Sequence, residues 1–431
     1  MQGSPGPLGP GPCLTPPVTD ASPATASPRM TATERRASAS LAAIFASRML
    51  GLFLVLPVFA LEAARYPGGD NPALIGMAMG IYGLTQGVLQ IPFGMASDRF
   101  GRKRVISLGL LVFALGSFVA AAAGSLTWLI VGRSLQGAGA VSAAVTALLA
   151  DQTRDEVRTK AMALVGASIG LMFAVSLVAA PLLAEHIGLS GLFAVTGTLA
   201  LGCIGIVQWW TPAEPLQHKN APRGRLAEVL AHGPLVRLDV GVFVLHAVQL
   251  AMWVAIPGLL VEAGLDKADH WHVYLPAVLA SFVVMAFTLF PLERRGYLRA
   301  VFLGAVGLVL LVELGLLAVA GRPSVPVLAV LLFLFFCGFN VLEASQPSMA
   351  SRLAPPHTRG TALGVYNTLQ SVGFFVGGAV GGWLVKNVGM AGLFTACAAL
   401  MLVWLVVAWP MRAPQARKSA EEVLADEAQA T

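Results

Sequence analysis

Charged side chains are scarce in this chain of 431 residues: Lys, Arg, Asp and Glu make up 12% of it, whereas hydrophobic residues make up 56%. Soluble domains carry about 25% charged residues, so this composition excludes an ordinary soluble protein. The apolar surface has to be covered by lipid, and the bilayer is therefore the first expected partner. The formal net charge of +6 is typical of the cytoplasmic loops of a membrane protein and does not indicate a nucleic-acid partner.

Cysteines are also few, and patterns of catalytic residues are missing. The sequence contains no CxxC pair, no phosphate loop and no Ser-His-Asp arrangement. The acidic residues and histidines within 266–272 lack the spacing of a metal site. We therefore predict no enzyme, no metal site and no cofactor. The four cysteines occur singly and predict no disulfide framework: Cys13, Cys203, Cys337 and Cys397.

Long hydrophobic runs are abundant. Twelve stretches have the length of about 18 to 25 residues that a helix needs to cross a bilayer. Lipid cannot hydrogen-bond to bare backbone groups, so each stretch is expected to be a helix and the fold class all-α. They cover approximately 40–61, 73–96, 105–123, 127–150, 161–184, 189–210, 238–261, 273–290, 300–320, 325–345, 361–385 and 390–409.

The distribution of Lys and Arg predicts the orientation. Of the 28 such residues, two lie within predicted helices, Arg48 and Arg133. Of the remaining Lys and Arg residues, all but four lie in every second connection between predicted helices or in the two terminal segments. Basic residues accumulate on the cytoplasmic side, so we expect both termini in the cytoplasm and a multi-pass protein of a bacterial inner membrane. The four basic residues expected outside are Arg65, Lys267, Arg322 and Lys386.

The polar segments divide the chain. The first 29 residues are rich in Pro, Gly, Ser, Thr and Ala and cannot bury enough surface to fold, and Met30 offers an alternative start. The longest internal polar stretch lies midway. The predicted parts are a disordered cytoplasmic segment (1–39), a six-helix bundle (40–210), a cytoplasmic linker (211–237), a second six-helix bundle (238–409) and a cytoplasmic tail (410–431).

The two predicted bundles repeat each other. A shift of 201 residues places "RTKAMALVGAS", from Arg158, on "RGTALGVYNTL", from Arg359. The same shift places "GLSGLF", from Gly188, on "GMAGLF", from Gly389. Two parallel halves around a central cavity are typical of a transporter.

One connection concentrates charge. The stretch "GMASDRFGRKR", from Gly94 to Arg104, joins the second and third predicted helices. It resembles motif A of the major facilitator superfamily, and "RSLQGAGA", from Arg133, resembles motif B of that family. The matching positions of motif A are Gly94, Asp98, Arg99, Gly101, Arg102 and Lys103.

The resemblance extends from Thr31 to about Met411. Within the family, this chain is similar to the drug:proton antiporter branch. It implies twelve helices in two pseudo-symmetric bundles. Two departures stand out: a soluble C-terminal domain implied by the resemblance is missing, and the glycine-proline step of motif C is Ala180-Pro181. The second departure weakens the assignment to drug efflux.

For the charged connection, the resemblance implies a gate. Asp98 accepts hydrogen bonds and suits the positive end of a helix, and the family points to the eleventh helix, near Gly360 and Thr361, as its partner. Gly94 would allow close helix packing and Gly101 a tight turn. In the alternative interpretation, the basic residues only set topology and anchor lipid headgroups.

Polar side chains inside the predicted helices are costly in lipid and therefore indicate function. Glu343 is our first candidate for a proton carrier, because burial opposes the charged form of a carboxylate. His246 is the second candidate, since histidine titrates near neutral pH. Both could instead be structural, and Glu313 has no role in this scheme. The predicted cavity residues are Tyr82, Gln86, Gln90, Arg133, Gln136, Gln249, Trp253, Asn340, Asn367 and Gln370.

The sequence thus predicts a monomeric transporter, driven by a proton gradient, that works by alternating access. The favoured function is export of small amphipathic or lipophilic compounds in exchange for protons. The alternatives are a proton symporter that imports a polar metabolite, which the many amide side chains would suit, and a membrane scaffold or sensor that transports nothing.

Overall fold

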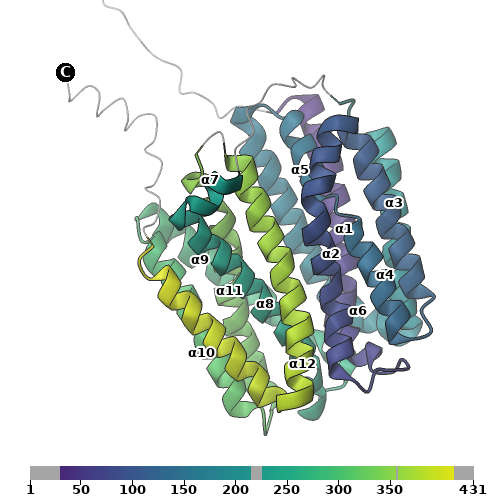
Figure 1. Cartoon of the computed structure of the whole chain (residues 1–431). Helices are drawn as coiled ribbons and strands as arrows, with labels where there is room; N and C mark the ends of the chain where they lie inside the picture. The colour runs from purple at the N-terminus through teal and green to yellow at the C-terminus, as the bar shows by residue number, and fades with distance from the viewer. Residues whose placement is uncertain (1–29, 215–225, 356–357, 412–431) are drawn as a thin grey trace, which may run out of the picture.

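The computed structural model describes residues 30–214, 226–355 and 358–411, and within them it contains helices and no strands (Figure 1). The helices stand side by side in one bundle. Their bounds are α1 Ala32–Ala63, α2 Pro72–Phe100, α3 Arg102–Ala121, α4 Leu126–Ala138, α5 Ser142–Asp151, α6 Asp155–Gly205, η1 Ile206–Trp210, α7 Leu226–Ala231, α8 Gly233–Glu262, η2 Lys267–Asp269, α9 Trp271–Arg294, α10 Leu298–Val319, α11 Val325–Leu353 and α12 Arg359–Ala408.

The first helix begins earlier than predicted. α1 starts at Ala32, so the last eight residues of the segment expected to be disordered, 32–39, are helical. The cause is a capping box: the Thr31 hydroxyl accepts from Glu34 N at 3.2 Å, and the Glu34 carboxylate accepts from Thr31 N at 2.8 Å. Residues 1–29 lie outside the described residues.

Nine helices in the described ranges are long and apolar enough to cross a membrane, whereas the sequence predicts twelve spans. Two of the nine, α6 and α12, are 51 and 50 residues long and each joins two helices at a glycine with non-helical backbone angles. These glycines are Gly188 (φ +62°) and Gly389 (φ +79°). The predicted fourth span is divided into α4 and α5, which are individually too short. The count of twelve stays a prediction.

The halves pack internally and then against each other. α1 packs on α6, and α3 on α4 and α6, while α8 packs on α12 and α11 on α9 and α10. The main contact between the halves is α2 against α12, with smaller contacts of α1 with α8 and α6 with α9. The end where α1 begins and α12 ends, uppermost in Figure 1, is called the termini side below, and the opposite end the far side.

Candidate functional site

Three helices of the second half bring an acid, a histidine and an amide together. His246 Nε2 on α8 lies 3.2 Å from Glu343 Oε2 on α11. Gln370 Nε2 on α12 lies 2.7 Å from the same histidine nitrogen and donates to Glu343 Oε1 at 3.4 Å. Three residues that the sequence singled out on separate helices therefore form one cluster.

The geometry assigns the two ring nitrogens of His246 to different partners. Nδ1 lies 2.8 Å from the carbonyl oxygen of Val242 and donates to it, so Nε2 is the nitrogen that faces Glu343 and Gln370. A neutral Nε2 accepts from the Gln370 amide, and a protonated Nε2 donates to Glu343. The His246 side chain is 2% exposed and that of Glu343 is 39% exposed. Of the two side chains, the glutamate is therefore the one that solvent can reach.

Two further polar residues of this half were missed by the sequence argument. Asp239 lies seven residues before His246 on α8 and is 5% exposed. Tyr366 lies four residues before Gln370 on α12, with a buried hydroxyl that has no hydrogen-bond partner in the described residues. The Tyr366 side chain is within electrostatic range of both Glu343 and Asp239. The seven-residue spacing from His246 was the available signal for Asp239, because it places both on one face of a helix.

In the first half, Arg48 of α1 is held by neutral side chains. Its guanidinium donates to Ser142 Oγ on α5 at 2.5 Å, to Tyr82 Oη on α2 at 2.7 Å and to Gln86 Oε1 at 3.3 Å. Arg48 is 3% exposed, and its Nε has no partner in the described residues. The predicted cavity residues Tyr82 and Gln86 thus meet at Arg48, one of the two basic residues within the predicted helices.

Arg133 forms a second, separate network with Gln136. It donates from Nη1 to Gln136 Oε1 at 2.9 Å, and from Nε and Nη2 to the carbonyl oxygens of Ala78 and Met79, both at 3.3 Å. Its guanidinium also lies over the rings of Phe59 and Tyr82, with centroid distances of 5.9 and 5.0 Å. Every nitrogen of this arginine is occupied within its own half.

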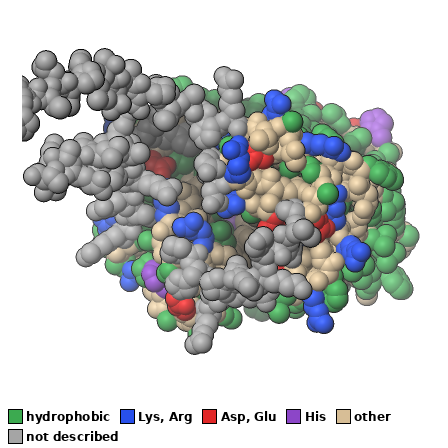
Figure 2. Space-filling model, turned by 90° about the horizontal axis from the view of Figure 1, so that it is seen from above, with side chains coloured by type: hydrophobic (Ala, Val, Ile, Leu, Met, Phe, Trp, Pro, Cys, Tyr) green, Lys and Arg blue, Asp and Glu red, His purple; other side chains and the backbone are tan. Residues whose placement is uncertain are grey.

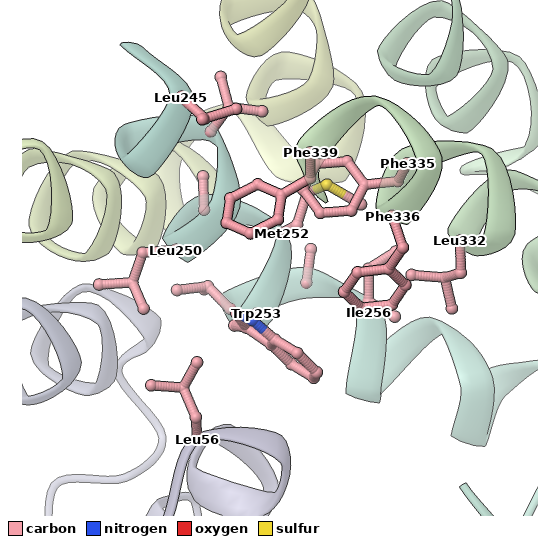
Figure 3. Close-up of a cluster of buried hydrophobic side chains, with 14 of the residues drawn as sticks. Leu56, Leu245, Leu250, Met252, Trp253, Ile256, Leu332, Phe335, Phe336 and Phe339 are labelled. Carbon is pink, nitrogen blue, oxygen red and sulfur yellow. The ribbon is translucent and has the colours of Figure 1, made fainter. Parts of the chain in front are cut away.

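The other predicted cavity residues lie apart from these clusters. Asn340 donates to Ser281 Oγ at 2.7 Å, Gln90 is 3% exposed with an unpartnered Oε1, and Asn367 is half-buried on α12. Gln249 and Trp253 line a cavity of only about 10 Å³. Figure 3 shows Trp253 within a cluster of hydrophobic side chains that includes Phe335, Phe336 and Phe339.

The contact between α2 and α12 is tight toward the far side. A Cβ atom on Gly76 would lie 2.1 Å from the Gly378 carbonyl oxygen, and one on Gly382 would lie 2.4 Å from that of Pro72. Along α2 the close approach continues to Gly83, where a Cβ atom would lie 2.4 Å from the Ser371 carbonyl oxygen. Only glycine allows this approach of the two backbones.

An ion pair also joins the halves at the far side. Lys267 Nζ, in the short helix after α8, lies 2.6 Å from Glu62 Oε1 at the end of α1. Arg65 contacts the other oxygen of Glu62 at 3.3 Å. Together with the glycine contact, this pair joins the two halves at the far side.

The charged connection after α2 forms a compact network. Asp98 pairs with Arg102 Nη1 at 2.5 Å, and Arg102 Nε contacts Asp151 of α5 at 3.1 Å. Lys103 donates to the carbonyl oxygen of Thr211 at 2.7 Å, while Arg99 is exposed over the Phe100 ring. These contacts join α2, α3 and α5 within the first half.

The glycines of this connection differ from each other. Gly101 has φ +97° at the turn between α2 and α3, as expected of a tight turn. At Gly94 the expectation of close packing is wrong, because a Cβ atom there would meet Ala143 Cβ at 3.7 Å, an ordinary contact. At the start of α3, the Glu214 carboxylate accepts from the backbone N of Arg102 at 3.0 Å and of Lys103 at 2.6 Å.

No group of three or more His, Cys, Asp or Glu side chains that could hold a metal ion occurs in the described part of the chain.

Comparison with known proteins places the chain among transporters. The model of the Major Facilitator Superfamily matches residues 40–292 and 238–428. The inner membrane transport protein YajR of Escherichia coli (strain K12) is 42% identical over 391 residues, which cover 90% of this chain and 85% of that protein. The multidrug resistance protein MdtH of Aeromonas salmonicida (strain A449) is 27% identical over 344 residues, covering 77% of this chain and 82% of MdtH.

Solved structures agree on the fold. The human organic anion transporter MFSD10 superposes with a TM-score of 0.67 at 17% identity, covering 88% of this chain and all of that chain. The POT family transporter PepTSo gives a TM-score of 0.70 at 12% identity, covering 89% of this chain and 98% of that chain.

Proposed function

Because the chain belongs to the Major Facilitator Superfamily and is a multi-pass membrane transporter, we propose that it couples the movement of protons to the export of small amphipathic or lipophilic compounds. The observation that supports this proposal is the His246–Glu343 pair, in which Nε2 of the histidine and Oε2 of the glutamate lie 3.2 Å apart. It combines a buried histidine with a partly exposed carboxylate inside the helix bundle, and ionisable side chains at such positions in a membrane protein indicate function.

The proposed orientation places the termini side in the cytoplasm. Seen from that side, Lys and Arg side chains are spread over the face and hydrophobic side chains lie around its rim (Figure 2). Basic side chains concentrate on the cytoplasmic face of membrane proteins, and apolar rims face lipid. The structure then corresponds to a state open to the cytoplasm.

Coupling follows from linkage. Protonation of the His246–Glu343 pair replaces a hydrogen bond from Gln370 by one to Glu343, which changes the packing between α8, α11 and α12. A proton that binds one state more tightly than the other shifts their balance by its differential affinity. Substrate bound from the cytoplasm favours the opposite change, so outward movement of substrate and inward movement of protons alternate.

Export is supported by the similarity to MdtH, whose name describes multidrug resistance. Import of a polar metabolite by symport is the second candidate, and the amides of Gln86, Asn367 and Gln370 support it. The two differ in the direction of proton movement when substrate is added to one side.

The test uses purified protein in liposomes with a pH dye inside. We expect candidate compounds to drive proton movement with wild type and not with Glu343→Gln. Glu262→Gln is the matched control, because Glu262 is an exposed glutamate at the far end of α8. Proton movement in Glu343→Gln equal to wild type would show that this carboxylate does not couple transport.

A further inference from the structure

Arg48 is a buried cation without a buried anion. Its three hydrogen bonds, to Ser142, Tyr82 and Gln86, all go to neutral oxygens. None of the described carboxylates forms an ion pair with it. By contrast, Arg102 pairs with two aspartates and Arg154 with Glu34 at 2.8 Å. Burying a charge without a counter-ion is costly, so a retained one indicates a partner that is absent from the protein itself.

The charged side chains of the two halves differ in whether they can become neutral. Arginine stays protonated at all accessible pH values, whereas Glu343 and Asp239 become neutral by taking up a proton. The permanent charge at the centre of the molecule is therefore positive and lies in the first half. A permanent cation as substrate would be repelled by Arg48 when the acids are protonated, and an anion would be attracted throughout.

Arg48 lies at the same depth as the acid–histidine cluster. Gly83, next to Tyr82 on α2, packs so closely on α12 that a Cβ atom there would lie 2.9 Å from Phe374 Cβ. The Phe374 ring lies 4.9 Å from the imidazole of His246. A short chain of contacts thus leads from the arginine across the bundle interface to the proton site.

A row of aromatic rings connects the two groups. Phe53 of α1 contacts Phe173 at 5.0 Å, and Phe173 contacts Phe336 of α11 at 6.1 Å between ring centroids. Phe335 and Phe339 continue the row to His246. The apolar packing between the halves thus separates a cation from an acid.

We propose that Arg48 is the subsite for an anionic group of the substrate, and that the substrates are amphipathic organic anions with an apolar body. This inference rests on the proposed transport function and names its substrate class. The anion replaces the longest of the three contacts, that of Gln86 at 3.3 Å, and meets Nη2. Gln86 and Ser142, which contact the guanidinium, are half-buried, whereas Arg48 itself is buried. The apolar body then packs on Phe53 and Phe374, the half-buried rings nearest to the two groups.

The test measures binding without transport, so that its failure is distinct from a failure of proton coupling. Benzoate, 2-naphthoate and octanoate are compared with their neutral amides and their trimethylammonium analogues by thermal unfolding of detergent-purified protein at neutral pH. We expect the carboxylates to stabilise wild type and the cations not to. In Arg48→Gln the apparent Kd of the carboxylates rises roughly 10- to 100-fold, the range for a lost charge-assisted hydrogen bond.

Two further variants make the result specific. Arg48→Lys keeps the charge and loses the planar fork, so it retains part of the affinity and also shows that the site tolerates substitution. Arg322→Gln removes an exposed arginine after α10 and leaves the apparent Kd at the wild-type value. The proposal is overturned if no carboxylate stabilises wild type, if the cations stabilise it instead, or if Arg48→Gln binds the carboxylates as wild type does. Carboxylate binding by a Glu343→Gln variant that moves no protons supports the Arg48 subsite whatever the coupling.

Discussion

The ammonium group of Lys267 lies 2.6 Å from Oε1 of Glu62, and this contact ties the end of α1 to the segment that follows α8. The Glu62 side chain is only 5% exposed, whereas that of Lys267 is 26% exposed. A partly buried pair is screened less than one on an open surface. The two halves of the molecule are therefore joined by charge at the far side, where they are also joined by the glycines of α2 and α12.

Replacing Lys267 by Met should favour opening of the far side. The pair contributes about 1 kcal/mol at a partly exposed site, so the ratio of open to closed molecules should rise roughly fivefold. Spin labels at Asp70 and Glu262, both exposed near the far ends of α2 and α8, report the separation of the halves. Lys386→Met removes an exposed lysine on the same side and should leave the distance distribution as in wild type.

The glycine contact should be more sensitive than the ion pair. In Gly378→Ala the new Cβ atom would lie 2.6 Å from the Gly76 carbonyl oxygen, and neither backbone can move without separating α2 from α12. We expect a loss of roughly 1–3 kcal/mol in the free energy of unfolding, as for other overpacked sites. Gly364→Ala, on the same helix but with nothing within 4 Å of its Cβ position, should be stable in the same thermal assay. Equal stability of the two variants would contradict the tight interface.

Asp239 should supply protons to the His246–Glu343 cluster. It lies seven residues before His246, or about 10 Å along the α8 axis, on the termini side of the cluster. Tyr366 on the neighbouring α12 is within electrostatic range of both Asp239 and Glu343. Asp239→Asn should slow proton-driven transport and leave exchange of labelled for unlabelled substrate unchanged. If both assays fall equally in a folded variant, Asp239 serves the structure and not the proton path.

Of the basic residues after α2, Arg102 should matter most for stability. Its guanidinium contacts Asp98, Asp151 and the hydroxyl of Ser97 at 2.7 Å, so it joins α2, α3 and α5. Arg102→Ala should lower the free energy of unfolding by roughly 1–3 kcal/mol, because it removes charge-assisted hydrogen bonds that join three helices. Arg104 is exposed, and Arg104→Ala should lie within about 0.5 kcal/mol of wild type. Similar unfolding curves for the two variants would mean that water replaces the contacts of Arg102 without loss of stability.

Hydrophobic length predicted the helices well, because a bilayer imposes one length on every span. It could not predict that the fourth span is broken. The break at Gly139 follows from packing: a Cβ atom there would lie 2.4 Å from the Gly109 carbonyl oxygen on α3. The Thr31–Glu34 spacing is typical of a capping box and indicated the early start of α1. The predicted start was taken from hydrophobicity alone and was therefore too late.

The candidate site was only partly predictable for a different reason. Helical spacing shows which residues share a face, so Glu343, His246 and Gln370 could each be chosen. Whether they meet depends on how α8, α11 and α12 are rotated and shifted against one another, which one helix alone does not encode. For the same reason, Gln249 and Trp253 were predicted to line the central cavity. In the structure they pack toward the far side with Phe335 and Phe336.

The two glycine turns within α6 and α12 also indicate how the two halves of the chain arose. Gly188 and Gly389 lie 201 positions apart, the shift that superposes the two halves, and both have positive φ. Substitution by any other residue is strained at such a backbone conformation, so selection holds glycine there. The preceding residues obey no such constraint: Glu185 and His186 precede one turn, and Lys386 and Asn387 the other. A duplicated ancestral half-gene would leave this record, with the turns preserved by geometry while the charges around them diverged.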